Sequence, residues 1–259
     1  MASNGKPLKQ IAESFQEIAL TLNSQASDIE VASFSRACSH VSVLFGCLGL
    51  AFKFAEMDYV AKVVVLVEAS KSIGTLQSLL DDDIQQNSVR KGGSHSRNLL
   101  RVKRGLDMVR VLFEKILMME GNSLRDPASV AYAQVFAPHH GWAIRKAVAA
   151  GMYALPTKAQ LLKKLNEDEA SARVQMESYV AASAPIINYI DKLFLSRELG
   201  IDCTCFVLYK ILKAHQTLGF HQWTVGKQCY STQTLSNCLM RFEQRSNTPY
   251  HLLLDLQTV

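Results

Sequence analysis

The stretch that decides the fold is RNLLRVKRGLDMVRVLFEKILMM, residues 97–119. Arg97, Arg101 and Arg104 are spaced i, i+4 and i+7, which places them on one face of a helix. A second set of side chains repeats with a period near 3.6 and predicts an apolar stripe along the same helix, formed by Leu99, Val102, Leu106, Val109, Phe113 and Ile116. This combination suits a ligand with an anionic head and hydrocarbon tails. A solvated basic face on an ordinary core helix is the simpler alternative.

The segments on both sides of this helix also have helical periodicity, and strand-like alternation of useful length is missing. Gly and Pro residues separate them into further expected helices at about 7–22, 31–47, 50–67, 74–86, 158–182 and 185–199. Pro138 and Pro156 bracket one more, which is expected to hold His140 and Trp142. The sequence therefore predicts an all-α architecture of about eight helices in packed layers.

Composition favours a packed, intracellular domain. The chain has 259 residues, of which 48% are hydrophobic and 20% charged, which is ample for a core. The longest apolar stretch, residues 41–52, is too short to span a bilayer, and the polar first residues do not read as a signal peptide. The six cysteines form no recognisable disulfide framework. A cytoplasmic protein with free thiols is expected.

Several classes of function are disfavoured. The sequence has no Gly-x-Ser-x-Gly elbow, P-loop or zinc motif, so neither an enzyme nor a cofactor is expected. His139 and His140 are adjacent, and their side chains would point about 100° apart on a helix, so no metal site is expected. Residues 203–259 carry +3 of the formal +5 charge. The remaining +2 and the lack of aromatics within the basic run argue against nucleic acid as a partner.

Three segments together carry a resemblance to a known family. They are the arginine helix, Phe-Lys-Phe-Ala-Glu-Met-Asp-Tyr-Val-Ala-Lys at 52–62, and Ala-Pro-His-His-Gly-Trp-Ala-Ile-Arg-Lys at 137–146. With them, residues 6–202 resemble the glycolipid transfer protein superfamily, in particular its plant accelerated-cell-death members, which transfer ceramide-1-phosphate. The resemblance implies a two-layer helical sandwich that encloses a hydrophobic lipid pocket between its layers, in a protein that makes transient peripheral contact with membranes.

The resemblance also implies the binding residues. It assigns Asp58 and His140 to the sphingolipid amide, and Trp142 to membrane docking, a role that suits an amphipathic ring. Glycolipid-binding relatives have asparagine and tryptophan where this chain has Lys62 and Arg101. Two cations suit a phosphate better than a sugar, and Arg97, one turn before Arg101, completes the phosphate site.

The implied function is non-enzymatic transfer of ceramide-1-phosphate and related phosphosphingolipids between membranes. Moving about 25 methylenes into water would cost on the order of 20 kcal/mol, so a carrier must supply an apolar sleeve. The accelerated-cell-death resemblance links the chain to programmed cell death and plant defence. The alternative is a phosphosphingolipid sensor that signals through protein partners. A lipid hydrolase and a nucleic-acid binder are less favoured.

Two features depart from the expected pattern. Val64 and Val65 stand where the resemblance leads us to expect acidic residues, so partly exposed valines are expected there. Residues 203–259 lie beyond the resemblance and have scattered apolar positions. They are expected to be an irregular, mostly disordered extension, with read-through of non-coding sequence as the leading explanation and a genuine extension as the alternative.

Overall fold

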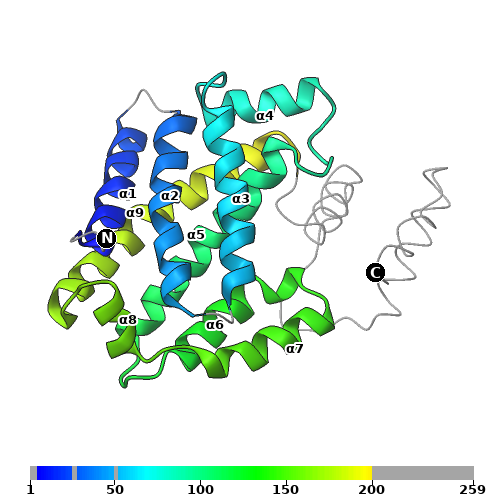
Figure 1. Ribbon diagram of the computed structural model, residues 1–259. Helices are drawn as coiled ribbons and strands as arrows, with labels where there is room; N and C mark the ends of the chain where they lie inside the picture. Colours follow the sequence, from blue (N-terminus) through cyan, green and yellow to red (C-terminus); the bar gives the residue numbers. More distant parts are fainter. Residues whose placement is uncertain (1–4, 25–27, 50–51, 200–259) are drawn as a thin grey trace, which may run out of the picture. The chain divides into compact units, whose positions relative to one another are not determined.

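The computed structural model describes residues 5–24, 28–49 and 52–199 (Figure 1). All of them belong to one compact unit, Met1–Leu208. The prediction for the extension at residues 203–259 therefore lies outside the described residues. In the described part, the helices begin with α1 (Pro7–Asn23), α2 (Val31–Cys47), α3 (Lys53–Ala69), α4 (Leu76–Gln85) and α5 (His95–Met118). They continue with α6 (Arg125–Val135), α7 (Trp142–Gly151), α8 (Lys158–Lys164) and α9 (Glu169–Ser196), and two short 3-10 helices flank α7 at Ala137–His139 and Met152–Ala154.

Side-chain caps explain where several helices start. Thr75, Ser94 and Asp168 each accept a hydrogen bond from a first-turn backbone N–H of the helix that follows. Thr157 and Gln160 form a reciprocal capping box at the start of α8. These caps satisfy amide groups that have no partner within the helix.

The helices form two layers. In Figure 1, α1, α2 and α3 run side by side in front, and α5 and α9 cross behind them. The packing of α1 on α9 and of α3 on α5 joins the layers, and α5 packs on α9 within the rear layer. An ion pair between Lys103 and Asp191 (2.7 Å) ties α5 to α9. Arg197, just after α9, donates two hydrogen bonds of 2.6 and 3.0 Å to Asp81 of α4. The all-α sandwich is as predicted.

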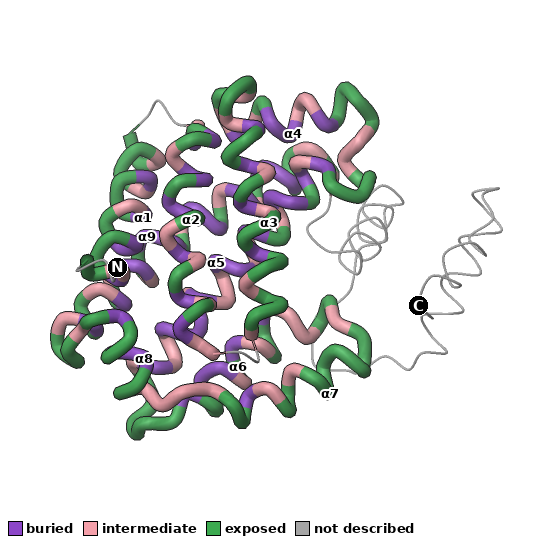
Figure 2. Tube along the Cα trace, viewed as in Figure 1, coloured by how far each residue is buried: buried purple, intermediate pink, exposed green. Residues whose placement is uncertain are grey.

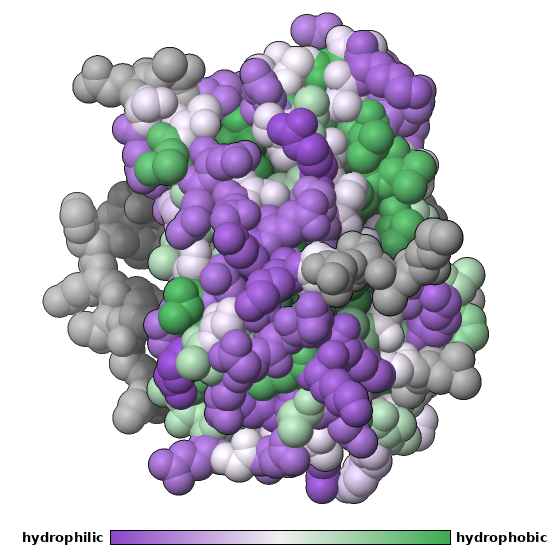
Figure 3. All heavy atoms as spheres, turned by 60° about the vertical axis from the view of Figure 1, so that its left-hand side comes forward, coloured by the Kyte–Doolittle hydropathy of each residue, from purple (hydrophilic) through white to green (hydrophobic). Residues whose placement is uncertain are grey.

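The core fills the space between the layers (Figure 2). Phe15, Phe113 and Tyr179 meet edge to face with ring centroids 5.0 and 5.6 Å apart. The Tyr179 hydroxyl donates to the carbonyl of Leu106 at 3.0 Å, which satisfies a polar atom that burial would otherwise penalise. In Figure 3, hydrophilic side chains cover most of one face, and strongly hydrophobic ones gather at its right-hand edge. Within the described residues, no helix is long and apolar enough to cross a membrane.

The structure corrects three helix boundaries. Residues 125–135 form α6, which was not predicted. The region after Lys158 forms a seven-residue helix and then one long helix, with Pro185 inside α9 instead of at a break. The first helix stops because Asn166 takes a left-handed conformation (φ 53°) and Asp168 caps the next one. His140 precedes α7 in an extended conformation and is not part of that helix.

Candidate functional site

Asp58 and Lys62 lie on one side of α3, one helical turn apart. Tyr59, Val63 and Leu66 on the neighbouring face of α3 are buried, so packing of this face fixes the direction in which the two charged side chains project. The Lys62 ammonium donates to Asp58 Oδ1 at 2.7 Å. The Asp58 side chain is 56% exposed and that of Lys62 is 20% exposed.

Arg101 reaches the same carboxylate from α5. Its Nη1 lies 3.6 Å from Asp58 Oδ1, which is an ion pair and too long for a hydrogen bond. One carboxylate thus stands between two cations on two helices, which leaves a local charge of +1. The Arg101 side chain is 48% exposed, so its remaining N–H donors are available to an anionic group arriving from solvent.

A close contact between α3 and α5 brings these residues together. A Cβ added to Gly105 would lie 2.7 Å from Cδ2 and Cε2 of Tyr59, closer than any real side chain comes. The Tyr59 ring therefore packs directly on the α5 backbone, and its hydroxyl donates to the carbonyl of Cys38 on α2 at 3.1 Å. Burial raises the pKa of Tyr59 well above its ordinary value, so it remains a neutral donor.

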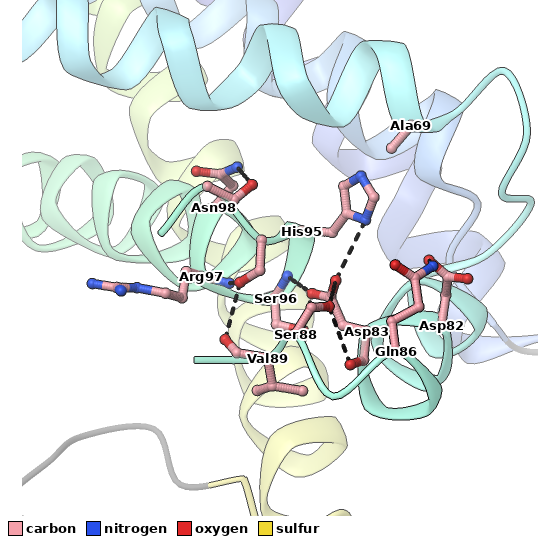
Figure 4. A network of polar contacts seen from close by, with 12 residues as sticks. Ala69, Asp82, Asp83, Gln86, Ser88, Val89, His95, Ser96, Arg97 and Asn98 are labelled. Carbon is pink, nitrogen blue, oxygen red and sulfur yellow. Dashed lines mark hydrogen bonds and ion pairs between the residues drawn. The ribbon is translucent and has the colours of Figure 1, made fainter. Parts of the chain in front are cut away.

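The start of α5 is anchored by a buried carboxylate (Figure 4). Asp83 of α4 accepts hydrogen bonds from the backbone N–H and the hydroxyl of Ser96, both at 2.6 Å, and from the Ser88 hydroxyl at 2.8 Å. Three donors offset the cost of burying a charge that is only 3% exposed. This network fixes the end of the helix that carries the arginines.

Arg97 points away from this network (Figure 4) and donates from Nη1 to the carbonyl of Arg90 at 3.1 Å. Of the three residues predicted to bind phosphate, the structure brings Lys62 and Arg101 together around Asp58. Arg97 lies one turn before Arg101 on α5 and donates to the preceding loop.

His140 sits against two aromatic rings. Its Nδ1 lies 2.9 Å from the Tyr132 hydroxyl, and its ring stacks on Phe136 with centroids 5.6 Å apart and an interplanar angle of 14°. Burial, and then the positive charges of Arg104 and Arg101, lower its pKa below the usual value. A neutral ring that accepts the Tyr132 proton at Nδ1 carries its own proton on Nε2 and can donate it.

The surface next to His140 is apolar and exposed. Trp142 is 69% exposed at the start of α7, Ile144 is 50% exposed, and no residue of α7 is buried. Tyr153, just beyond α7, is 71% exposed and lies under the guanidinium of Arg125. An exposed tryptophan and isoleucine on one short helix, with an exposed tyrosine just after it, are typical of a membrane or protein contact surface.

One cluster bears on the expectation that no metal is bound. Asp82, Asp83 and His95 offer ligand atoms within 4.8 Å of one another. Both oxygens of Asp83 already accept hydrogen bonds from Ser88 and Ser96, and His95 Nδ1 lies 3.7 Å from Asp83 Oδ1. The carboxylate serves as the anchor of α5, and His95 Nδ1 is buried without a hydrogen bond to the described residues.

Some residues that shape the site were missed by the sequence analysis. Tyr132 and Phe136 precede His140 by eight and four residues, across a helix end, where no regular spacing identifies partners. Gly105 offered a signal, since a glycine within a long periodic helix often marks a close packing contact.

An all-α sandwich with a cationic cluster beside an exposed apolar helix defines the class of helical lipid-binding proteins. The family model for Glycolipid transfer protein (GLTP) matches residues 29–167. The chain belongs to this family, as predicted, and is a lipid transfer protein and not an enzyme.

Individual relatives agree with this assignment. Accelerated cell death 11 of Arabidopsis thaliana is 65% identical over 198 residues, which cover 76% of this chain and 96% of the relative. A ceramide-1-phosphate transfer protein of Danio rerio is 30% identical over 152 residues, 54% of this chain and 71% of the relative. The crystal structure of an aspartate-to-asparagine variant of Accelerated cell death 11, complexed with C12 ceramide-1-phosphate, superposes with a TM-score of 0.76 at 64% identity and covers 77% of this chain and 100% of that chain.

Proposed function

We propose that the protein transfers ceramide-1-phosphate and related phosphosphingolipids between membranes and acts in the control of programmed cell death. The observation that carries the proposal is the paired cation site, in which Lys62 and Arg101 from two helices flank Asp58. The similarity to Accelerated cell death 11 and to its ceramide-1-phosphate complex supports both the ligand and the cell-death role.

The phosphate takes its place beside Lys62 and Arg101. Each charge-assisted hydrogen bond to it is worth about 1.5–3 kcal/mol, and Arg101 provides a planar pair of donors for two phosphate oxygens. Arg97 binds the phosphate after its guanidinium breaks the hydrogen bond to the Arg90 carbonyl. The Arg97 side chain rotates toward the head group, and α5 itself stays in place.

Two side chains bind the amide of the sphingoid base, one as a hydrogen-bond acceptor and one as a donor. Asp58, held between the two cations, accepts the amide N–H. His140, with its proton on Nε2, donates to the amide carbonyl. Phosphatidic acid, a diacyl phosphate, has no amide N–H. When it is bound, Asp58 would have no donor to accept from, and this unpaired polar group would disfavour phosphatidic acid relative to a phosphosphingolipid.

The hydrocarbon chains enter between the layers. That space is filled by side chains such as those of Leu44, Val63 and Leu106, so the layers must separate as the chains enter. Core side chains that become exposed when the layers separate are buried again against the lipid chains. This burial contributes about 25 cal/mol per Å² of apolar surface. Trp142 and the exposed face of α7 dock on the membrane while this exchange takes place.

Vesicle-to-vesicle transfer of a fluorescent ceramide-1-phosphate tests the proposal. We expect Arg101→Leu to nearly abolish transfer with unchanged circular dichroism, because a half-exposed arginine contributes little to folding. Arg173→Leu is the matched control, since Arg173 is 53% exposed in a surface pair with Glu177 on α9. Near wild-type transfer by Arg101→Leu would refute the phosphate site.

The second candidate is a phosphosphingolipid sensor that acts through protein partners. It is supported by α7, which has no buried residue and so offers an exposed surface on which a partner could bind. Transfer kinetics separate it from a carrier. A carrier moves ceramide-1-phosphate in many turnovers per chain, whereas a sensor binds the lipid from donor vesicles and releases it slowly. A stoichiometric burst without further transfer would favour the sensor.

A further inference from the structure

The outward side of α3 carries an exposed apolar row that the lipid site does not use. Met57, Val60, Val64 and Val67 are 58%, 37%, 59% and 40% exposed. Their spacing of three, four and three residues repeats that of the seam along which two helices pack in a coiled coil. We call these four residues the α3 stripe. In Figure 1, α3 is the last of the three helices of the front layer, on the side away from α1.

The α3 stripe is separate from the head-group site. At 100° per residue, Asp58 lies roughly 100–160° around the helix from Met57, Val60 and Val64. Tyr59 and Val63 occupy the buried side. A molecule docked on the stripe therefore leaves the side of α3 that carries Asp58 and Lys62 open.

Ion pairs flank the stripe, with the cation first at one end and the anion first at the other. Lys53, 54% exposed, precedes it and is paired with Glu56 of the same helix at 2.9 Å. Glu68, 70% exposed, follows it and is paired with Lys71 at 2.6 Å. Two copies of α3 placed antiparallel, with a twofold axis between Val60 and Ala61, set Met57 against Val64 and each Lys53 against the other copy's Glu68. A parallel pair would set like charges against each other.

We propose that the chain forms a weak, symmetric homodimer through antiparallel contact of the α3 stripes. A twofold contact uses the same patch on both copies, and the stripe is self-complementary in shape and charge, with the small Ala61 at the axis allowing close approach. The patch exposes on the order of 300 Å² of apolar surface, a size at which patches are often functional. Two copies with their charged flanks reach about 1,000 Å², the lower limit of specific interfaces.

A bilayer is a less suitable occupant, because the charged side chains at both ends of the stripe would have to enter the membrane with the apolar ones. An interface of this size is expected to associate reversibly.

Sedimentation velocity of the full-length chain across a concentration series tests the proposal. Val64→Glu should abolish the dimer, whereas Val174→Glu on α9 should leave it intact; both valines are 59% exposed. Lys53→Glu and Glu68→Lys should each raise the dissociation constant at least tenfold. The double exchange Lys53→Glu with Glu68→Lys should restore it, since the two charges then meet again across the axis.

Circular dichroism confirms that each variant folds. A wild-type chain that is monomeric throughout the series overturns the proposal, as does a dimer that survives Val64→Glu. The antiparallel arrangement is contradicted if neither charge change alters the dissociation constant of the dimer. It is also contradicted if the double exchange does not restore the wild-type dissociation constant. If Val64→Glu instead reduces binding to vesicles of phosphatidylcholine while the wild type stays monomeric, the occupant is a membrane and the proposal is wrong.

Discussion

Substitution of Gly105 by alanine should loosen the contact that assembles the head-group site. The new Cβ would lie 2.7 Å from two ring atoms of Tyr59. That ring is 5% exposed, packs on Phe45 with centroids 4.8 Å apart and is held by the hydrogen bond to Cys38. The ring has no free space to enter, so α3 and α5 must move apart.

Two opposing effects set the size of the change. Overpacking a buried contact costs about 1–3 kcal/mol, whereas replacing glycine within a helix stabilises it by about 1 kcal/mol. We expect a net loss of roughly 1 kcal/mol in the free energy of unfolding and a fall in Tm of about 2–4 °C. The gap between Arg101 and Asp58 should widen, and ceramide-1-phosphate transfer should fall further than stability does.

Gly46→Ala is the matched control. Gly46 lies within α2, and a Cβ there would make only an ordinary contact, 3.8 Å from Glu56. Gly46→Ala should raise Tm, because alanine favours the helical conformation more than glycine does and no overpacking opposes this gain. Scanning calorimetry of both variants, followed by the transfer assay, decides the matter. If Gly105→Ala raises Tm as much as Gly46→Ala does, the close contact does not exist. Tyr59→Leu in the Gly105→Ala background should recover stability, because neighbouring substitutions are coupled.

Three further predictions follow from the site. Asp58→Val should remove the preference for ceramide-1-phosphate over phosphatidic acid, while Glu177→Val, at a similarly exposed 55%, should keep it; equal discrimination in wild type and Asp58→Val would contradict the amide role. Because the folded-state pKa of His140 is lowered, the neutral ring stabilises the fold above about pH 6.5 and this contribution is lost as pH falls through the folded pKa. The Tm difference between wild type and His140→Gln should therefore shrink on acidification, and a difference that grows would show the opposite shift. Trp142→Ala should lower vesicle binding several-fold and leave Tm within about 1 °C, since the ring is 69% exposed; unchanged vesicle binding would exclude it as the anchor.

The all-α architecture could be predicted because long helices with a period near 3.6 bury one face and have few alternatives. Helical spacing also places Asp58 and Lys62 on one face of α3, but only the family resemblance implied that Arg101 of α5 joins them. The structure brings Asp58, Lys62 and Arg101 together. The position of Arg97 could not be predicted, because its guanidinium is set by a loop carbonyl at Arg90. The prediction of helical His140 was wrong because a short 3-10 turn precedes it.

Pro185 shows a second limit of sequence reasoning. A proline usually ends a helix, yet α9 continues through it for another eleven residues. Ile186, Ile190 and Phe194 beyond it are buried, and burial of this apolar face outweighs the lost backbone hydrogen bond. Local propensity predicted a break, and tertiary packing prevents it.

Native mass spectrometry of the full-length chain, incubated with ceramide-1-phosphate, phosphatidic acid and galactosylceramide of matched chain length, tests the central claim most directly. Three ligands of similar apolar area separate the contribution of the head group from that of the chains. We predict one bound lipid per chain, with ceramide-1-phosphate dominant in wild type and no longer dominant in Arg101→Leu. Dominant galactosylceramide, or equal occupancy by all three lipids in wild type, would contradict the account.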